Sequence, residues 1–328
     1  MLAPDNFFRR IVGDYFRFAV NFFRTEYVYR KKFTRRKAGN HTPSLVVFFV
    51  DGYMIHGGLG DRLKGIISTY AVCKVKSLPF RICFDTPFAL QDYLVPNRYD
   101  WIPKPGERIV FSRKCAKIVN VHNHPKSNAL FGLPQDSPIQ YHVYGNMNIL
   151  DRINERFAVD FKWADLFDEL FRPSDLLAES VGEHLRRIGG PYLSLHFRFQ
   201  QLLGDFRDPD CETLPVAERE RLICQCLDYV SKMQQQVSSK ILVLSDSSTW
   251  IKRLEEKALE NVHTLPGEVV HMDYAGKDDR HLKTFLDFFM LRQSVKIVAV
   301  VAGRMRISEF PRYAALSAGI PYETVHLG

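Results

Sequence analysis

The chain has 328 residues, a net charge of +8 and a 46% hydrophobic share. This length suits two domains, and the hydrophobic share is ordinary for a globular protein with a buried core. No apolar run approaches the roughly 18 residues of a membrane-spanning helix, so the sequence predicts none.

Six cysteines are scattered along the chain, at 73, 83, 115, 211, 224 and 226, without a Cys-x-x-Cys motif, and no histidine pair stands at zinc-binding spacing. This pattern argues against a zinc site and favours buried, reduced thiols. Together with the lack of a secretory signal, it predicts a reducing, cytoplasmic setting.

Residues 1–40 hold most of the charge. They carry ten Lys and Arg against three acids, a net +7, which leaves +1 for the rest of the chain. They predict an amphipathic helix whose aromatic face is backed by arginines, typical of a helix lying in lipid headgroups. Packing on the protein body, binding a partner or binding nucleic acid remain alternatives. The predicted apolar face consists of Phe7, Phe8, Ile11, Val12, Tyr15, Phe16, Phe18, Ala19, Phe22 and Phe23.

The next segment reads as a βαβ unit. A buried strand is predicted at Leu45–Val50, a helix at Asp61–Lys76 and a second strand at Arg81–Phe84. Residues 86–150 read as loops with short elements, and Asp160–Ile188 reads as helical with an interruption at a proline.

The strand and helix alternation then restarts. The predicted elements are strands at Tyr192–Phe197, Lys240–Leu244 and Lys296–Val301, and helices at Leu214–Gln236, Thr249–Glu260, Lys283–Arg292 and Pro311–Ala318. Two such runs predict an α/β protein with two Rossmann-like domains facing each other across a cleft. We place the leader at 1–40, the N-terminal domain at 41–188 and the C-terminal domain at 189–328.

A glycine-rich stretch opens the first predicted helix. Gly58 and Gly60 leave bare backbone at a helix N-terminus, where N–H groups and the helix dipole favour an anion such as phosphate. The stretch is not a Walker A loop, because no Gly-Lys-Ser/Thr occurs. It is a poor dinucleotide fingerprint, because Leu63 stands where the third glycine belongs, although Asp85 lies at a plausible distance for a ribose. A tight turn without a ligand is the other interpretation.

Three later stretches carry polar groups past predicted strands, where α/β sheets bind ligands. His196 and Arg198 end the strand in "LSLHFRF", and Asp246 follows the strand in "LVLSDSS". The third stretch, residues 283–316, runs through a helix, a buried strand and a loop of glycine and arginine to another helix. An arginine can hold a diphosphate through two parallel charge-assisted bonds.

These four stretches, in this order, resemble the fucosyltransferase superfamily, including its O-, alpha-1,2- and alpha-1,6-fucosyltransferase-like branches. The resemblance covers residues 45–328 in outline. It implies the two-Rossmann GT-B fold, with the acceptor on the N-terminal domain, the donor on the C-terminal domain, a GDP-sugar donor and no metal. It matches the family's glycine loop to Gly58, Gly60 and Asp61, and its phosphate-binding arginine to Arg198.

The resemblance also implies a donor site farther along the chain. Asp287 matches an acid that reads the guanine edge, and the loop from Gly303 through Arg304 to Ser308 matches a phosphate contact. A carboxylate suits guanine because it accepts from N1–H and N2–H together. The sequence departs from the family where Phe199 replaces a second arginine and where Asp205 comes later than usual.

We therefore expect an inverting, metal-independent glycosyltransferase that moves fucose from GDP-fucose to a glycan hydroxyl in surface polysaccharide synthesis. Arg198 would neutralise the leaving diphosphate, and the base for the acceptor hydroxyl is expected to be Asp205, then Asp61 or Asp208. His196 is expected to orient the strand end or touch the sugar. The expected location is the cytoplasmic face of a membrane, held there through residues 1–40.

Other functions remain open. The alternatives are a heptosyltransferase-like GT-B enzyme with an ADP-sugar donor, a non-catalytic membrane-tethered protein that binds polyanions, and an NAD-linked dehydrogenase. The failed fingerprint at Leu63 argues against the dehydrogenase.

Overall fold

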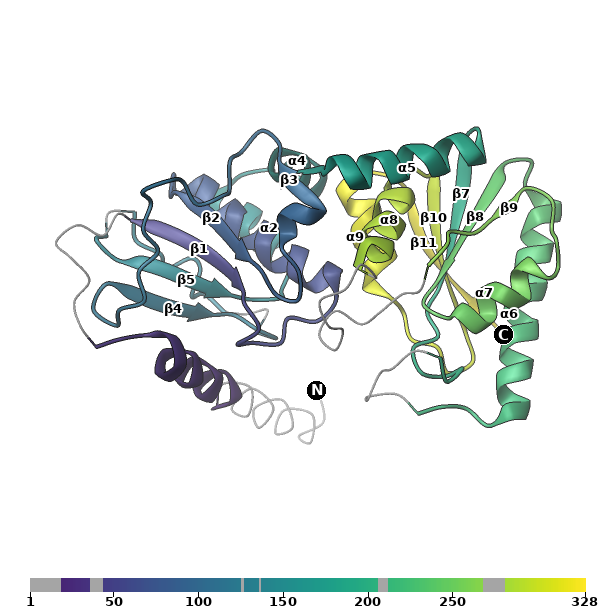
Figure 1. The fold of residues 1–328 in the computed structure, drawn as a ribbon, viewed down its shortest axis with the longest axis horizontal. Coiled ribbons are helices and arrows are strands. Elements are labelled where there is room, and N and C mark those ends of the chain that lie inside the picture. Colours follow the sequence, from purple (N-terminus) through teal and green to yellow (C-terminus); the bar gives the residue numbers. More distant parts are fainter. Residues whose placement is uncertain (1–18, 36–43, 125–126, 136, 206–211, 268–280) are drawn as a thin grey trace, which may run out of the picture. The chain divides into compact units, whose positions relative to one another are not determined.

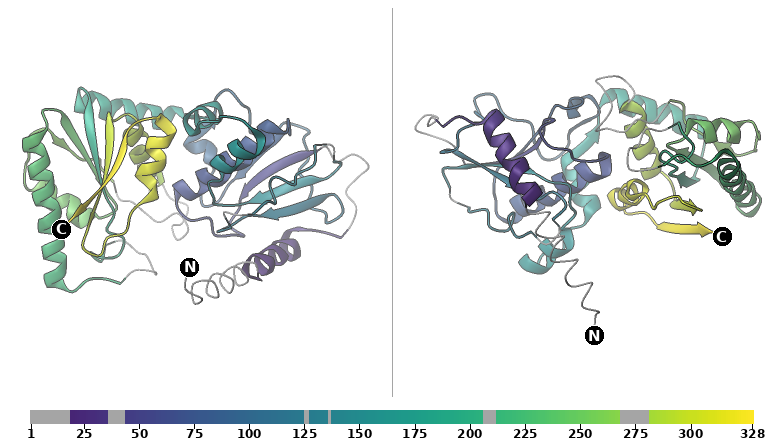
Figure 2. Two further views of the ribbon diagram at one scale, coloured as in Figure 1. Left: turned by 180° about the vertical axis from the view of Figure 1, so that it is seen from behind. Right: turned by 90° about the horizontal axis from the view of Figure 1, so that it is seen from below.

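The computed structural model describes residues 19–35, 44–124, 127–135, 137–205, 212–267 and 281–328. These residues form two compact units. The first contains the described residues up to Gly57 together with Asp61–Thr86 and Pro96–Lys162, and the second contains Gly58–Gly60, Pro87–Val95 and Trp163–Gly328. Figures 1 and 2 show that each unit is built around its own sheet.

The first unit has a four-stranded parallel sheet with the strand order β2-β1-β5-β4. Its strands are β1 (Leu45–Val50), β2 (Phe80–Phe84), β4 (Ala116–Asn120) and β5 (Gln140–Tyr144). Its helices are α2 (Leu59–Val75), which begins within the second unit, and α3 (Leu150–Phe157). Every residue of β1 is buried, as a continuous apolar run in a parallel sheet predicts. The βαβ unit expected at residues 45–84 is confirmed.

The short elements expected within the loops of residues 86–150 include two strands of this sheet, β4 and β5, which the sequence did not identify as strands. β5 lies between β1 and β4 at the centre of the sheet, although its sequence contains polar residues. The Gln140 side chain accepts from the Val110 N–H (2.9 Å) and donates to the Arg108 carbonyl (2.8 Å). Because its partners lie in a neighbouring loop, this glutamine can be buried within a strand. The strand therefore lacks the apolar pattern by which a strand is recognised in a sequence.

Residues 19–32 are helical and pack on the first unit. Val28 is fully buried, and the Tyr29 hydroxyl accepts from the Ile118 N–H at 2.8 Å. Lys32 forms an ion pair with Asp51, which also accepts from the Tyr144 hydroxyl at 2.7 Å. The described part of the leader therefore packs on the protein body, while its residues 1–18, which carry most of the predicted apolar face, lie outside the described residues.

Not all of this helix is covered. Phe22, Phe23 and Tyr27 are exposed to 54%, 70% and 49%. Within the described segments, no helix combines the length and apolar character needed to cross a membrane.

Aromatic rings surround a buried histidine beneath this helix. His142 on β5 is fully buried, with the rings of Phe49, Phe111 and Phe33 at 4.7, 5.2 and 5.3 Å between centroids. Neither of its nitrogens hydrogen-bonds to a described residue. Burial, helped by the charge of Lys32, lowers its pKa from 6.5 to about 3. His142 is therefore neutral at neutral pH.

The second unit has a five-stranded parallel sheet with the strand order β11-β10-β7-β8-β9. Its strands are β7 (Tyr192–Phe197), β8 (Lys240–Ser245), β9 (Val262–His263), β10 (Lys296–Ala302) and β11 (Tyr322–Leu327). This is the Rossmann order, in which the chain runs outward from β7 in one direction and then returns to continue on its other side. The topological switch point lies between β7 and β10.

Helices cover both faces of this sheet. They are α4 (Trp163–Leu170), α5 (Asp175–Ile188), α6 (Val216–Gln236), α7 (Ser248–Glu255), α8 (His281–Arg292) and α9 (Glu309–Ala318). α6 and α7 contribute to one apolar core with Leu195 and Phe197. On the other face, the Tyr192 hydroxyl donates to the Met290 carbonyl of α8 at 2.6 Å. A two-stranded sheet pairs β3 (Leu94–Pro96) with β6 (Phe171–Pro173).

The division between the units comes earlier than the expected boundary after residue 188. Helix α4 packs on α9, and α5 packs on α8, so both helices belong to the second unit. The sequence predicted the helices and the proline interruption, but helix content alone does not say which sheet a helix covers. It also missed β9 and β11, which are short or only half-buried.

The described cysteines are all free thiols. Cys73, Cys115 and Cys226 are buried, as expected, whereas Cys224 is exposed. Burial raises the pKa of Cys226 to about 12, which keeps this thiol protonated and unreactive at neutral pH.

The neutral, buried His142 predicts acid sensitivity. The unfolded state binds a proton near pH 6.5 and the folded state only near pH 3, so folding stability is present above pH 6.5 and is lost as the pH falls toward 3. The free energy of unfolding should fall between pH 7.5 and pH 4.5. We expect this fall to be about 2–3 kcal/mol smaller in His142→Phe than in the unchanged protein. Urea unfolding at several pH values measures this difference.

The matched control is His326→Phe, because His326 is exposed on β11. At pH 7.5 His142→Phe should stay within about 1.5 kcal/mol of the unchanged protein, since no hydrogen bond is lost. Equal acid sensitivity in all three proteins would contradict the prediction.

Candidate functional site

Three strands of the second sheet end at one edge. The register pairs Phe197 of β7 with Ser245 of β8 and with Val300 of β10, so the carboxyl ends of the three strands lie together. The next residues in the chain are Arg198, Asp246 and, after two more residues of β10, Gly303. The structure thus brings together the three strand ends that the sequence selected, on both sides of the switch point.

Asp246 organises the turn after β7. One carboxylate oxygen accepts from the Phe199 N–H at 2.7 Å and the other from the Gln200 N–H at 2.9 Å. Burial raises the pKa of Asp246, while Arg198 and these two N–H groups oppose the shift. The Asp246 side chain is 5% exposed. This burial and these bonds fit a carboxylate that holds backbone.

Arg198 is a partly exposed cation at the switch point. Its Nη1 lies 4.0 Å from Asp246 Oδ2, at the limit of an ion pair, and its side chain is 29% exposed. Asp246 thus helps to orient the guanidinium from one side. A guanidinium in this position can bind an oxyanion with charge-assisted hydrogen bonds.

His196 on β7 precedes Arg198 and lies on the face of the sheet that α9 covers. Its ring is buried, lies 5.8 Å from the Phe310 ring and has no described partner for Nδ1. Burial and the charges of Arg198 and Lys283 lower its pKa to about 3. This side chain is neutral at neutral pH and a weak base, which suits a positioning or hydrogen-bonding role.

Asp205 lies at the N-terminus of α7. Its Oδ2 accepts from the Thr249 N–H at 2.7 Å and from the Ser247 hydroxyl at 2.8 Å. These contacts satisfy helix N-terminal donors, as a capping carboxylate does. Asp208, the other acid proposed from this stretch, lies outside the described residues.

Asp287 is buried on α8 and forms an ion pair with Lys283 one turn earlier. Burial raises the pKa of Asp287, and Lys283 opposes the shift. The sequence did not single out Lys283, although its i,i+4 spacing to Asp287 on a predicted helix was a usable signal. Lys283 also lines a cavity of about 390 Å³ with Asp246, Ser247 and Asp205.

The loop after β10 leads into α9. Gly303 has a positive φ of 50°, and the Ser308 side chain caps α9 by accepting from the Phe310 N–H at 3.3 Å. Arg304 is exposed and lies 3.9 Å from Glu212. The phosphate contact that the family resemblance implies for this loop stays a prediction, and a helix N-terminus beside a glycine turn is a place where an anion can bind.

The glycine stretch at α2 contains a third glycine, Gly57, and this is the one that its surroundings constrain. Gly57 has φ +88°, and a Cβ there would lie 2.3 Å from Asp61 Oδ2, whereas a Cβ on Gly58 meets no described atom within 4 Å. Asp61 pairs with Lys64 at 2.5 Å. In the second unit, Gly60 lies near α9, because its Cβ would be 3.9 Å from the Phe310 Cα. The sequence named Gly58 and Gly60 but missed Gly57, whose backbone the turn requires.

No protein-family model and no curated protein matches this sequence. Solved structures match its fold. A point mutant of Arabidopsis thaliana FUT1 in complex with GDP aligns over 87% of this chain and 71% of its own, with a TM-score of 0.53 and 12% identity. The alpha-1,6-fucosyltransferase NodZ soaked with GDP-fucose aligns over 83% of this chain and 92% of its own, with a TM-score of 0.51 and 13% identity.

The selenomethionine form of fucosyltransferase NodZ from Bradyrhizobium gives a TM-score of 0.51 at 12% identity, over 83% of this chain and 91% of its own. The chain shares the fold of these proteins. The predicted fold class, α/β with two Rossmann-like domains, is confirmed. At such identity the likeness concerns the fold, and the role of each side chain rests on its own geometry.

Gly57 and Gly58 should respond differently to substitution by alanine. Gly57→Ala should destabilise the protein by about 1–3 kcal/mol, because alanine is strained at φ +88° and collides with Asp61. Gly58→Ala should change stability by less than about 0.5 kcal/mol, since space is open there. Thermal and urea unfolding of the two variants compare them directly; equal losses would contradict this account of the turn.

Proposed function

We propose that this protein is an inverting, metal-independent glycosyltransferase that moves fucose from GDP-fucose to a glycan hydroxyl. The observation that carries the proposal is the switch point of the second sheet, where Arg198 and the glycine loop before α9 flank one edge. Ligands of open α/β sheets bind at such a point, and a cation beside a helix N-terminus suits a diphosphate. The fold shared with fucosyltransferases supports the same choice.

The chemistry is an in-line displacement. The acceptor oxygen forms a bond to the anomeric carbon, the bond from that carbon to the diphosphate oxygen breaks, and GDP leaves with the electron pair. Negative charge grows on the departing diphosphate, and stabilising it is the main electrostatic demand. Arg198 supplies a full positive charge, and the N–H groups near Gly58, Gly60 and Gly303 supply partial charges, so the proposal needs no metal.

The acceptor proton needs a base. Asp205 remains the proposed base, with Asp61 second, and both also have structural partners. A base that also caps a helix keeps one carboxylate oxygen for the cap and uses the other for the proton. His196 is proposed as a donor-positioning group, because its lowered pKa makes it a poor proton acceptor.

The donor base is proposed to bind near α8. Asp287 is the carboxylate that would accept from the guanine N1–H and N2–H groups, which adenine lacks in this arrangement. Its pairing with Lys283 means that this ion pair must open or shift for Asp287 to reach a base. This requirement leaves an ADP-sugar transferase of heptosyltransferase type as the alternative, which a comparison of donors decides.

The test is a donor panel with matched variants. Purified protein is incubated with GDP-fucose, GDP-mannose, ADP-heptose and UDP-sugars, and nucleotide release is measured. We expect release from GDP-fucose, lowered about 10²–10³-fold or more in Arg198→Ala, because the charge that stabilises the leaving group is removed. The control is Arg253→Ala, since Arg253 is an exposed arginine of the same unit that pairs with Glu220.

Near-normal turnover in Arg198→Ala would remove the central assignment, and release from ADP-heptose alone would favour the alternative donor. In the same assay, Asp205→Asn separates a base from a cap. Loss of turnover with an unchanged unfolding midpoint supports the base, whereas a lowered midpoint with normal turnover per folded molecule supports the cap alone.

We further propose that the acceptor is a lipid-linked or surface glycan, reached from the cytoplasmic face of a membrane through the leader. The support comes from the exposed rings of Phe22, Phe23 and Tyr27, which lie on the described helix beside Arg30 and Lys31. Lys31 Nζ is 5.9 Å from the centre of the Tyr27 ring. Aromatic rings interleaved with cations suit the headgroup layer of an anionic membrane.

Vesicle binding tests this surface. The protein should sediment with phosphatidylserine-containing vesicles and not with pure phosphatidylcholine, and Phe22→Ser with Phe23→Ser should weaken sedimentation at least about tenfold, because each ring contributes about 1.5–3 kcal/mol when buried. Leu176→Ser is the control, as Leu176 is equally exposed, at 56%, on a helix of the second unit. Unchanged binding of the double variant would assign the surface another role.

A further inference from the structure

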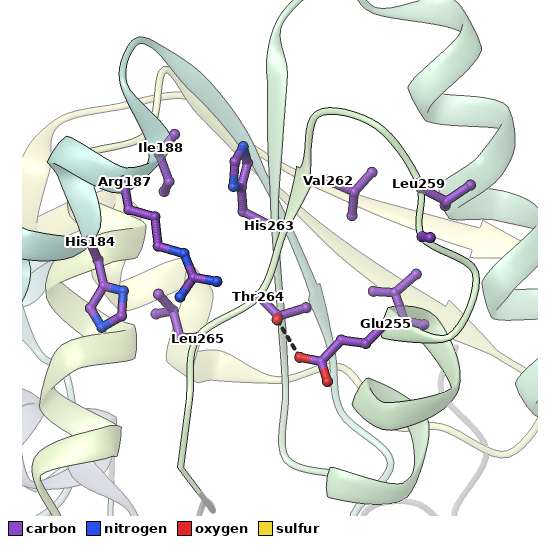
Figure 3. Close-up of a pocket in the computed structure, with 11 residues that line it drawn as sticks. His184, Arg187, Ile188, Glu255, Leu259, Val262, His263, Thr264 and Leu265 are labelled. Carbon is purple, nitrogen blue, oxygen red and sulfur yellow. Dashed lines mark hydrogen bonds between the residues drawn. The ribbon is translucent and has the colours of Figure 1, made fainter.

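A second cavity in the second unit involves none of the residues discussed for the donor. It encloses about 250 Å³ between the C-terminal half of α5, the end of α7 and β9 (Figure 3). Six of its eleven lining residues are apolar, and its polar groups converge from three different elements. The apolar lining consists of Ile188, Leu254, Ala258, Leu259, Val262 and Leu265.

One side of this cavity is basic. Figure 3 shows the Arg187 guanidinium extending between the imidazoles of His184 and His263. His184 is 7% exposed, and the buried Nε2 of His263 has no hydrogen-bond partner in the described chain. Arg187 is an exposed residue. A cation, the His184 imidazole and a buried nitrogen without a partner therefore meet at one side of the cavity, and the buried nitrogen is the group that a ligand would satisfy.

Burial, more than the neighbouring charges, lowers the pKa of both imidazoles. Burial lowers the pKa of His184, with Arg187 and Lys283 adding to the shift against Glu183. Burial also lowers the pKa of His263, with Lys240 and Arg187 adding to it. The surroundings of both rings thus carry an excess of positive charge, which an anionic group in the cavity would balance.

The other side carries a carboxylate. The Thr264 hydroxyl donates to Glu255 Oε1 at 2.6 Å, and the Glu255 carboxylate lies across from the basic groups (Figure 3). An anion alone would be repelled by this carboxylate, whereas a ligand with an anionic end and hydroxyls at the other end would suit both sides. A cavity of this volume holds about eight waters at their liquid volume, which is too small for a nucleotide.

We propose that this cavity binds a small phosphate monoester that carries hydroxyl groups. The phosphate lies against Arg187, His184 and His263, and the hydroxyls donate to Glu255. The cavity shares only Glu255 and Leu265 with the 390 Å³ cavity beside Asp246, so ligands in the two can bind together. The proposal does not depend on the transferase reaction.

Calorimetric titration of the full chain tests the site, with sn-glycerol 3-phosphate as the probe and glycerol and inorganic phosphate as comparisons. We expect saturable binding of glycerol 3-phosphate, weaker binding of phosphate and none of glycerol. Arg187→Ala should weaken binding about tenfold or more, because charge-assisted bonds to the phosphate are lost. The matched control is Arg186→Ala, the adjacent exposed arginine of α5, which does not line the cavity.

A second variant, His263→Phe, removes an imidazole while keeping a ring, and circular dichroism of each variant verifies folding. GDP should not compete with glycerol 3-phosphate, and its own affinity should be unchanged in Arg187→Ala. Equal weakening by Arg187→Ala and Arg186→Ala, or glycerol binding as tightly as its phosphate, would overturn the proposal. The absence of any binding at 10 mM glycerol 3-phosphate would also overturn the proposal, because a specific site is expected to have a dissociation constant below about 10 mM.

Discussion

The carboxylate of Asp246 holds the turn on which the candidate site depends. Its two oxygens take the N–H groups of Phe199 and Gln200, so the chain leaving β7 is fixed to the end of β8. Gln200 adopts φ +53°, an uncommon conformation for a residue other than glycine, and the bond to its N–H stabilises it there. Because Arg198 directly precedes this turn, its direction is set by backbone geometry. The carboxylate therefore positions a cation by charge and by backbone bonds together.

The same constraint accounts for the burial of Asp246. An ionised carboxylate at 5% exposure carries a large desolvation cost, which only charge-assisted bonds can offset. Two N–H donors and a nearby guanidinium provide them on one strand end. The Lys283–Asp287 pair solves a similar problem on α8 with a flexible partner. The first carboxylate has rigid partners and is suited to structure, whereas the second is paired with one long side chain of its own helix.

Much of the fold could be predicted from the sequence, because several of its parallel strands are mainly apolar. β1 is a continuous apolar run, β10 is one after Lys296, and β7 departs from it only at Ser194 and His196. The ends of β7 and β10 fixed the places where Arg198 and the loop from Gly303 to Ser308 were sought. β5 could not be found this way, since its glutamine and histidine are accommodated by residues distant in the chain. Pattern reading detects elements that are apolar in themselves, and it misses elements whose polar side chains are satisfied by tertiary contacts.

The candidate site was predictable to a similar extent, and for the same reason. Strand ends can be read from the sequence, so His196, Arg198 and Asp246 were found together. Partners are set by tertiary structure, so the bonds of Asp205 to Ser247 and Thr249 were not foreseen. Glycine-rich turns are intermediate in how far they could be predicted. The sequence shows that the turn is rich in glycine, but the need for a glycine at Gly57 follows from a positive φ that residue spacing does not reveal.

Asp205 illustrates how structure and chemistry can share one side chain. Its Oδ2 is bound to the first turn of α7, which fixes the carboxylate in the cavity wall beside Asp246 and Ser247. A general base gains from such fixation, because a carboxylate held by one oxygen presents the other in a defined direction. The capping bonds therefore give the proposed base a fixed orientation, and they leave the oxygen that makes none of them for the acceptor hydroxyl.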